Sequence, residues 1–378
     1  MVFLSGPRQV GKTTLSEIFA TTYFNWDYVR DRTILLRGED AVASEAGLDQ
    51  KRSALPTLVF DEIHHYGKWK LFLKGFFDIF GRRTRILVTG SSRLDVFKKS
   101  GDSLMGRYFP YRMHPLSVGE LLHPVPPEHA IVPAAEPDPA AFAALVEHGG
   151  FPEPFRNRST TFSRRWRRLR NEQLIREDLR KDTNIHELAQ LEVLATLLAN
   201  RSGEQLVYTS LSREVQVSEV TVRAWIEVLQ SFFLGFTIRP WASNIENSLR
   251  KTPKWYLRDW SGIEDEGARN ETMLACHLLK AVEMWTDIGL GEYGLYYVRD
   301  KQQREVDFLV AKDGRPWLLV EAKTSNTNLS PSLAFMQSRT GAPVAVQTVA
   351  SLDFDAVDCF SPGPPCIVPL KTFLSQLP

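Results

Sequence analysis

Short apolar runs and amphipathic stretches alternate along the first third of the chain. Residues 2–4, 58–60 and 86–88 are wholly apolar, as in strands of a parallel sheet that is covered on both faces. Between the first two runs, residues 14–20 carry apolar side chains at the spacing of one helix face. Strands that alternate with helices predict an α/β module built on a parallel sheet.

Helical spacing dominates the middle of the chain, where residues 164–170 contain five arginines and Trp166. One interpretation is a charged helix with Trp166 and Leu169 packed inward and Glu172 neutralising part of the charge. The other is a basic surface whose aromatic ring stacks on a nucleic-acid base. We favour the first interpretation and keep the second open.

Residues 211–225 begin a second helical pattern, which is typical of a winged helix-turn-helix. Ser218 is a favourable N-cap for the second helix of this pattern. The apolar stripe of that helix consists of Val222, Trp225, Ile226 and Leu229. Acids at least equal bases on its polar face, unlike a helix that reads the DNA major groove. A lid packed on the first module is therefore favoured over a DNA-reading helix.

The last third of the chain returns to strand patterns. A helix is predicted over 267–284, ahead of strands over 295–298, 304–310 and 317–323. These elements indicate a further α/β domain. The expected organisation is an α/β module over 1–122, a proline- and alanine-rich linker over 123–148, a helical, winged-helix-like domain over 149–250 and an α/β domain over 251–378.

Composition and charge narrow the range of functions. Of the 378 residues, 43% are hydrophobic and 24% are charged, which fits a globular and not a disordered protein. The formal net charge of +1 excludes a polybasic tail that acts through bulk charge, but not a local basic surface. The three cysteines are too few and too scattered for a disulfide framework, and no segment resembles a membrane span or a secretory signal. We therefore expect a cytoplasmic protein without a membrane partner.

The first chemical motif lies between the first strand and the first helix. Gly6, Gly11, Lys12 and Thr13 fit the phosphate-binding pattern GxxxxGK[ST]. Glycines let the backbone approach phosphate oxygens, and the helix N-terminus favours negative charge. Lys12 would contact the β- and γ-phosphates of ATP, and the Thr13 hydroxyl would ligate Mg²⁺. The residues expected to bind ATP are Gly6, Pro7, Arg8, Gln9, Val10, Gly11, Lys12, Thr13, Thr14 and Ser91.

A second motif supports the first. The strand over 56–60 ends in Asp61 and Glu62, the arrangement known as Walker B. Asp61 would hold Mg²⁺ through water, and Glu62 would orient or activate the attacking water. Ser91 follows the next strand and is either a sensor of the γ-phosphate or part of an ordinary turn.

A third set of candidate residues lies in the last domain. Asp307 and the Glu321–Lys323 pair fall on adjacent predicted strands, and Glu271 lies in the helix before them. The spacing resembles the core of PD-(D/E)xK nucleases. In that arrangement Asp307, Glu321 and Glu271 would hold Mg²⁺, and Lys323 would hold or activate the nucleophile. The alternative is a charged hairpin with a solvent-exposed Glu–Lys pair.

Several segments together resemble the AAA+ branch of P-loop ATPases, and more narrowly the bacterial and archaeal ATPases that carry a C-terminal domain of unknown function 4143. They are GPRQVGKTTL at 6–15, NWDYVRDRTILL at 25–36, VFDEIHHYGKWK at 59–70, VTGSS at 88–92 and SLMGRYFPYRMHPLSVGEL at 103–121. The resemblance implies Mg²⁺-dependent ATP hydrolysis and a homo-oligomer.

In such an oligomer Arg107 would reach the γ-phosphate of a neighbouring subunit, and a surface or internal salt bridge is the alternative role. Relatives carry a further segment ahead of the loop, whereas five residues precede Gly6 here. We therefore expect either a start further upstream or an incomplete adenine pocket.

Two hypotheses follow from these patterns. In the first, the protein hydrolyses ATP and its nuclease-like domain acts on nucleic acid. The expected catalytic residues are Glu62, Arg107, Asp307, Glu321 and Lys323, and the expected metal ligands are Thr13, Asp61, Glu271, Asp307 and Glu321. In the second, ATP gates a binding module with slow turnover and no nuclease activity.

Overall fold

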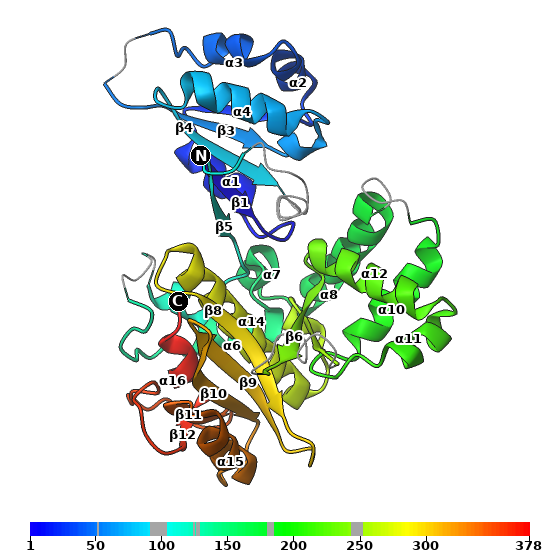
Figure 1. Ribbon diagram of the computed structural model, residues 1–378, viewed down its shortest axis with the longest axis vertical. Helices are drawn as coiled ribbons and strands as arrows, with labels where there is room; N and C mark the ends of the chain where they lie inside the picture. The colour runs from blue at the N-terminus through cyan, green and yellow to red at the C-terminus, as the bar shows by residue number, and fades with distance from the viewer. Residues whose placement is uncertain (51–52, 91–103, 124, 126–128, 180–184, 243–251) are drawn as a thin grey trace. The chain divides into compact units, whose positions relative to one another are not determined.

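The computed structural model describes residues 1–378 apart from 51–52, 91–103, 124, 126–128, 180–184 and 243–251. The chain divides into two compact units, Met1–His114 and Pro115–Pro378 (Figure 1). Among the helices of the described residues, none combines the length and the hydropathy that crossing a bilayer requires.

A parallel five-stranded sheet forms the centre of the first unit. Its strands are β1 (Val2–Ser5), β2 (Thr22–Asn25), β3 (Thr57–Asp61), β4 (Arg85–Gly90) and β5 (Phe109–Arg112), in the order β2-β3-β4-β1-β5. Every pairing is parallel, so the carboxyl ends of all five strands lie at one edge of the sheet. In open α/β sheets this edge is where ligands bind. The predicted parallel sheet is confirmed.

Helices of the first unit bury aromatic side chains against this sheet. They are α1 (Lys12–Phe19), α2 (Val29–Leu36), α3 (Glu39–Glu45), the 3₁₀ turn η1 (Ile63–His65) and α4 (Trp69–Phe80). Phe72 and Phe76 of α4 meet Phe60 of β3 edge-on, with ring centroids 5.8 and 5.5 Å apart. By contrast, α1 buries Lys12 and Ser16 and leaves Ile18 and Phe19 exposed.

A mixed seven-stranded sheet organises the second unit. Its strands are β6 (Gly235–Pro240), β7 (Lys254–Leu257), β8 (Tyr293–Arg299), β9 (Glu305–Lys312), β10 (Arg315–Lys323), β11 (Val344–Val349) and β12 (Cys366–Pro369), in the order β12-β11-β10-β9-β8-β6-β7. β8, β9 and β10 form an antiparallel meander, and β11 runs parallel to β10. Asp313 and Gly314 both have positive φ and form the two-residue turn between β9 and β10.

Two helices cover opposite faces of this sheet (Figure 1). α14 (Glu266–Asp287) shares a core with Phe308 and Val310, and α15 (Pro331–Thr340) shares another core with Leu309. The remaining helices of the unit are α5 (Val118–Leu122), α6 (Pro139–His148), α7 (Pro152–Asn157), α8 (Thr160–Gln173), the π-helix η3 (Leu174–Leu179), α10 (Leu188–Ala199), α11 (Tyr208–Val215), α12 (Glu219–Ser231), the 3₁₀ turn η4 (Trp260–Gly262) and α16 (Leu370–Ser375).

Segments that were expected to belong to separate domains lie in one compact unit, Pro115–Pro378. Residues 139–148 of the expected linker form α6, whose Leu145 lies in the α14 core and accepts a hydrogen bond from the Trp260 indole at 2.9 Å. β6, from the expected middle domain, pairs with β8 through Arg239 and Pro240. Backbone pairing and a common core therefore join residues that composition alone separates.

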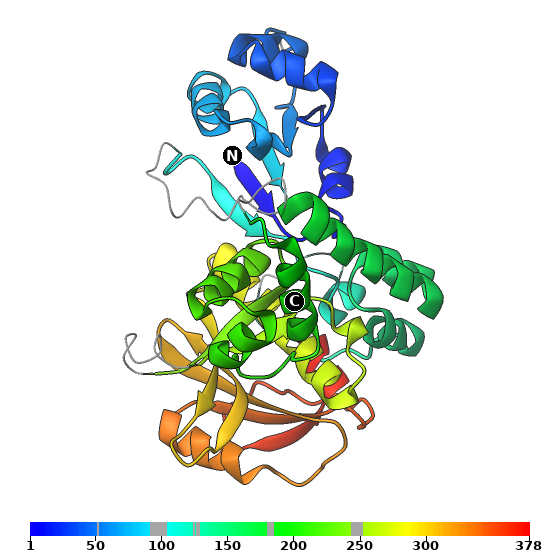
Figure 2. The same cartoon turned by 90° about the vertical axis from the view of Figure 1, so that its right-hand side faces the viewer.

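The helix predicted after Ser218 is confirmed. The Ser218 hydroxyl accepts a hydrogen bond from the Thr221 amide at 3.1 Å, and α12 buries the predicted stripe. α10, α11 and α12 pack together (Figures 1 and 2), and the antiparallel β6–β7 pair follows them. The guanidinium of Arg223 lies 3.6 Å from the centroid of the Tyr208 ring.

The arginine-rich helix α8 departs from the prediction at one position. Trp166 is buried as expected, but Leu169 is 43% exposed and Arg170 is buried in its place. Arg170 stacks on the Phe151 ring, 4.2 Å from its centroid. Burial lowers the pKa of Arg170 to about 10. A planar guanidinium can fill an aromatic site that a branched leucine would not match.

Candidate functional site

The loop between β1 and α1 is shaped by its glycines. Gly11 has φ 106°, in the left-handed region that favours glycine. A Cβ at Gly6 would collide with the carbonyl oxygen of Met113, next to β5. The backbone therefore turns tightly at both ends of the loop, and α1 begins directly after Gly11.

Lys12 folds back over this loop. Its Nζ donates to the carbonyl oxygens of Gly6 at 2.9 Å and Pro7 at 2.7 Å, and the residue is 7% exposed. The ammonium group is thus held at the loop, beside the N-terminus of α1. This is the placement that binding of β- and γ-phosphates requires.

Asp61 lies at the carboxyl end of β3, in contact with the first residues of α1. Thr13 donates from its hydroxyl to Asp61 Oδ2 at 3.2 Å, Tyr23 donates to the same oxygen, and Thr89 donates to Oδ1. Burial, and next the hydrogen bond to Asp61, raise the pKa of Tyr23. The structure therefore brings together Thr13 and Asp61, as the two motifs predict. Tyr23 and Thr89 were missed, because no spacing in the sequence marks them.

Glu62 follows Asp61 in a left-handed conformation with φ 52°. Its amide donates to the carbonyl of Thr89 at 3.1 Å. Burial, and next the charge of Asp61, raise the pKa of Glu62 to about 7, while Lys12 and Arg8 act in the opposite direction. A carboxyl group that titrates near neutral pH can accept a proton from water.

Two histidines accompany Glu62. His64 Nδ1 lies 3.3 Å from Glu62 Oε2, and His65 Nδ1 lies 3.7 Å from Asp27 Oδ1. Glu62, His64 and His65 can each offer a ligand atom such that the three atoms lie within 4.8 Å of one another. The sequence contains these histidines at 64 and 65, but no spacing rule singled them out.

Two predicted residues remain outside this cluster. Ser91 lies outside the described residues. Arg107 forms a two-pronged ion pair with Asp78 of α4, with Nε 2.8 Å from Oδ1 and Nη2 3.2 Å from Oδ2. This pairing corresponds to the alternative role considered for Arg107, and the contact with a neighbouring γ-phosphate stays a prediction.

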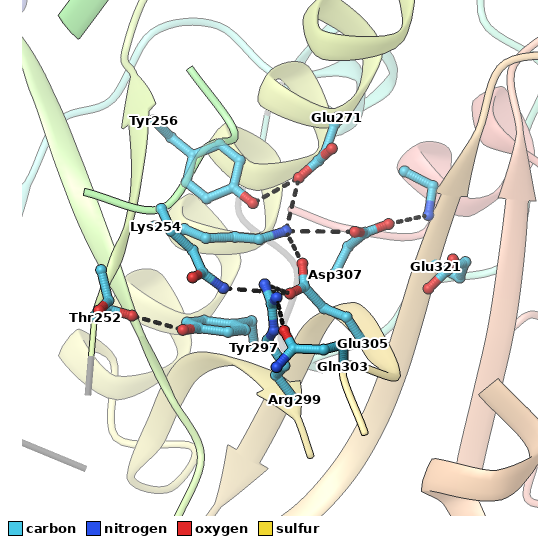
Figure 3. A network of polar contacts seen from close by, with 12 residues as sticks. Thr252, Lys254, Tyr256, Glu271, Tyr297, Arg299, Gln303, Glu305, Asp307 and Glu321 are labelled. Atoms are coloured by element: carbon cyan, nitrogen blue, oxygen red, sulfur yellow. Dashed lines mark hydrogen bonds and ion pairs between the residues drawn. The ribbon is translucent and has the colours of Figure 1, made fainter. Parts of the chain in front are cut away.

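A second polar cluster lies in the second unit, around Lys254 of β7 (Figure 3). Lys254 Nζ is 2.7 Å from Glu305, 3.4 Å from Glu271 and 3.5 Å from Asp307, and its side chain is 6% exposed. Burial alone would lower the pKa of Lys254, but the carboxylates outweigh it and raise the pKa. Tyr256 donates to Glu271 Oε1 at 2.7 Å.

A β-bulge turns Asp307 toward this cluster. Tyr296 pairs with Leu309 and Val298 with Val306, so β9 contains one extra residue between the two pairs. Val306 and Phe308 consequently contact opposite cores although they are two positions apart. Bulges re-aim side chains in this way next to functional sites.

Glu321 and Lys323 lie on the neighbouring strand β10. Lys323 Nζ donates to Glu321 Oε1 at 2.7 Å, whereas Glu321 Oε2 is buried and has no hydrogen-bond partner among the residues that the structure describes. Asp307 Oδ2 accepts from the Ala322 amide at 2.9 Å, which links the two strands. Burial, and next the charge of Asp307, raise the pKa of Glu321 and of Glu271 to about 7.

The structure thus gathers all four predicted residues of this domain. Glu271 and Asp307 meet at Lys254, and Glu321 with Lys323 joins them through β10. Lys254, Glu305 and Tyr256 were missed; the only signal in the sequence is a lysine beside the apolar residues 255–257. The carboxylate oxygens of Glu271, Asp307 and Glu321 are ligands that suit Mg²⁺. However, the Lys254 ammonium group already lies against the carboxylates of Glu271, Glu305 and Asp307.

Family comparisons divide the chain into three matched segments. Residues 1–122 match an AAA domain, residues 140–263 match a domain of unknown function (DUF8612), and residues 266–351 match a domain of unknown function (DUF4143). The chain is 27% identical over 342 residues to two uncharacterized proteins, Rv2008c of Mycobacterium tuberculosis and Mb2031c of Mycobacterium bovis. The alignment covers 88% of this chain and 72% of each relative.

Two solved structures show remote likeness to this chain. The Aeropyrum pernix ORC1 protein in complex with DNA aligns with a TM-score of 0.31 and 15% identity, over 72% of this chain and 86% of that chain. Drosophila ORC bound to AT-rich DNA and Cdc6 aligns with a TM-score of 0.23 and 11% identity, over 72% and 85%. TM-scores this low support no further conclusion. Residues 1–122 are therefore similar to an AAA domain, and two segments that match domains of unknown function follow them in the chain.

Proposed function

We propose that the first unit binds Mg·ATP and hydrolyses it. The observation that carries this proposal is the contact between Thr13 and Asp61 beside the loop that holds Lys12. These two oxygen-bearing side chains are 48 residues apart in the chain and converge where phosphates would enter. When bound, Mg²⁺ neutralises charge on the β- and γ-phosphate oxygens. Thr13 and Asp61 would hold it.

The neighbouring side chains have distinct roles in this proposal. Lys12 exchanges the carbonyl oxygens of Gly6 and Pro7 for phosphate oxygens. Glu62 orients the attacking water and accepts its proton, a role that its raised pKa favours. Arg107, whose guanidinium is held by Asp78 on the surface of α4, would exchange that partner for a γ-phosphate in a homo-oligomer. Ser91 is proposed as the γ-phosphate sensor.

Steady-state ATPase measurements test this proposal. Glu62→Gln keeps the shape of the side chain and removes the base, so the protein should bind ATP while turnover falls by about 10²- to 10⁴-fold. Glu17→Gln is the matched control, because Glu17 is exposed on α1, and it should hydrolyse ATP at the wild-type rate. Unchanged turnover in Glu62→Gln would refute the assigned role.

A second candidate function concerns the second unit. We infer that its carboxylate and lysine cluster acts on nucleic-acid phosphodiesters, as in PD-(D/E)xK nucleases. Support comes from the element order α14-β8-β9-β10-α15-β11 and from the convergence of Glu271, Asp307, Glu321 and Lys323. Glu271, Asp307 and Glu321 would hold Mg²⁺, which polarises a phosphodiester and activates water.

Plasmid nicking separates this candidate from a nucleotide-gated binding module. A nuclease would nick supercoiled DNA in the presence of Mg²⁺, and Asp307→Asn would abolish nicking while Asp353→Asn, an exposed matched control, would not. A binding module would bind ATP, turn it over slowly and leave the plasmid intact. Nicking that persists in Asp307→Asn would exclude the proposed site.

A further inference from the structure

Lys254 occupies the position of a cation among acidic side chains. Its Nζ contacts carboxylate oxygens from three positions on two elements: Glu271 of α14, and Glu305 and Asp307 of β9. Figure 3 shows the ammonium group at the centre of this arrangement. One ammonium group therefore contacts the carboxylate oxygens that a divalent ion would use.

The lysine is fixed in this position by the fold. Lys254 begins β7, and its neighbours Trp255 and Tyr256 are fully buried. The aliphatic stem reaches inward, with Nζ 5.7 Å from the centroid of the Tyr297 ring. The side chains of Glu271 and Asp307 are 22% and 16% exposed, so withdrawal of the almost inaccessible ammonium would leave two partly buried carboxylates without this counter-ion, which is unfavourable.

The carboxylate oxygens nearest to Lys254 already have partners. Glu271 Oε1 accepts from Tyr256 as well as from Lys254, and Asp307 uses one oxygen for Lys254 and the other for the Ala322 amide. A divalent ion bound directly to Glu271 and Asp307 would come within a few ångströms of Nζ. Two cations that close together in a buried site repel each other strongly.

We propose that Lys254 is the resident cation of this site, and that a divalent metal binds to Glu271 and Asp307 only when Lys254 withdraws. The inference rests on the second candidate function only for the identity of the metal-binding oxygens. Lys254 thereby keeps the metal out of the resting protein, so any metal-dependent chemistry at Asp307 first requires Lys254 to move away.

Mn²⁺ titration of the full chain without nucleotide, followed by electron paramagnetic resonance, tests this proposal. Lys254→Met should bind one additional Mn²⁺ per chain. Wild type should bind Mn²⁺ at Asp307 at least about tenfold more weakly than this variant does. Adding Asp307→Asn to Lys254→Met should remove the gained site, which distinguishes it from binding near Asp61. Lys301→Met is the matched control, because Lys301 is exposed in the β8–β9 turn, and it should gain no site.

Thermal unfolding gives a second readout. Without metal, Lys254→Met should unfold at a lower temperature than wild type, and Mn²⁺ should raise its midpoint more than that of wild type, because a ligand of the native state stabilises it. Lys254→Arg retains the charge and should gain neither a Mn²⁺ site nor metal-dependent stability.

Two outcomes would overturn the proposal. One is Lys254→Met that folds and gains no Mn²⁺ site. The other is wild-type protein that binds Mn²⁺ stoichiometrically at a site removed by Asp307→Asn, and this result needs no Lys254 variant. None of these measurements uses DNA cleavage. If the protein never nicks DNA, the proposed role of Lys254 is unaffected. If wild type binds the metal tightly, the role of Lys254 is refuted but the nuclease proposal is not.

Discussion

The second unit should lose stability in acid because of one buried histidine on α14. His277 Nε2 lies 3.1 Å from the Val118 amide and accepts its hydrogen, while Nδ1 lies 2.8 Å from the Met273 carbonyl and donates to it. This arrangement requires the neutral imidazole, because a protonated Nε2 cannot accept. Burial lowers the pKa of His277 to about 4, and the nearby charge of Lys280 acts in the same direction.

The size of the effect follows from linkage. The unfolded chain binds the proton with a pKa of about 6.5 and the folded protein with a pKa of about 4, so acid favours unfolding. The contribution of His277 is therefore complete above pH 6.5 and is lost as the pH falls toward 4. Between pH 8 and pH 5 the difference amounts to about 2 kcal/mol, or about 4 °C in the midpoint of a domain of this size.

Thermal unfolding of wild type and His277→Gln between pH 8 and pH 5 measures this contribution. Glutamine can retain a donor and an acceptor but does not titrate, so the variant should lose about 4 °C less than wild type over this range. Other titrating groups affect both proteins equally and cancel in the comparison. An identical pH dependence in the two proteins would refute the reasoning.

Three further predictions concern the loop, the Asp61 cluster and α12. Gly6→Ala should abolish ATP binding, measured by fluorescence of a nucleotide analogue, because the added Cβ collides with the Met113 carbonyl. Thr89→Val removes a hydrogen bond to Asp61 and should weaken Mg·ATP binding by about tenfold, whereas unchanged affinity would argue against the position of Asp61. Ser218→Ala removes the N-cap of α12 and should lower the free energy of unfolding by about 1 kcal/mol in denaturant titration; Ser212→Ala on α11 should have a smaller effect.

Local patterns were sufficient for much of the fold and for part of each site. Three strands of the first unit (β1, β3 and β4), the loop and the helix after Ser218 follow from periodicity and from residues with special backbone or capping properties, whereas β2 and β5 were not predicted. Thr13 and Asp61 were expected to meet because parallel strands end at one edge of a sheet. Glu271, Asp307 and Glu321 were expected together because their spacing resembles the core of PD-(D/E)xK nucleases.

What the sequence did not predict depends on distant contacts. The bulge in β9 arises from pairing with β8, and no residue type near Asp307 predicts a bulge. Lys254 reaches the carboxylates because β7 joins the same sheet, through β6, as the strands that carry them. On α8, Arg170 is buried instead of Leu169, because its guanidinium stacks on the ring of Phe151. Each of these outcomes depends on a partner that is remote in sequence.

Isothermal titration calorimetry of ATP with Mg²⁺ tests the central claim most directly, because that claim is that the loop of the first unit binds the nucleotide. Wild-type protein should bind one ATP per chain, and Lys12→Ala should bind it at least about tenfold more weakly. Lys68→Ala, an exposed lysine ahead of α4, should bind as wild type does. Equal binding by Lys12→Ala and wild type, or no binding by wild type, would contradict the assignment.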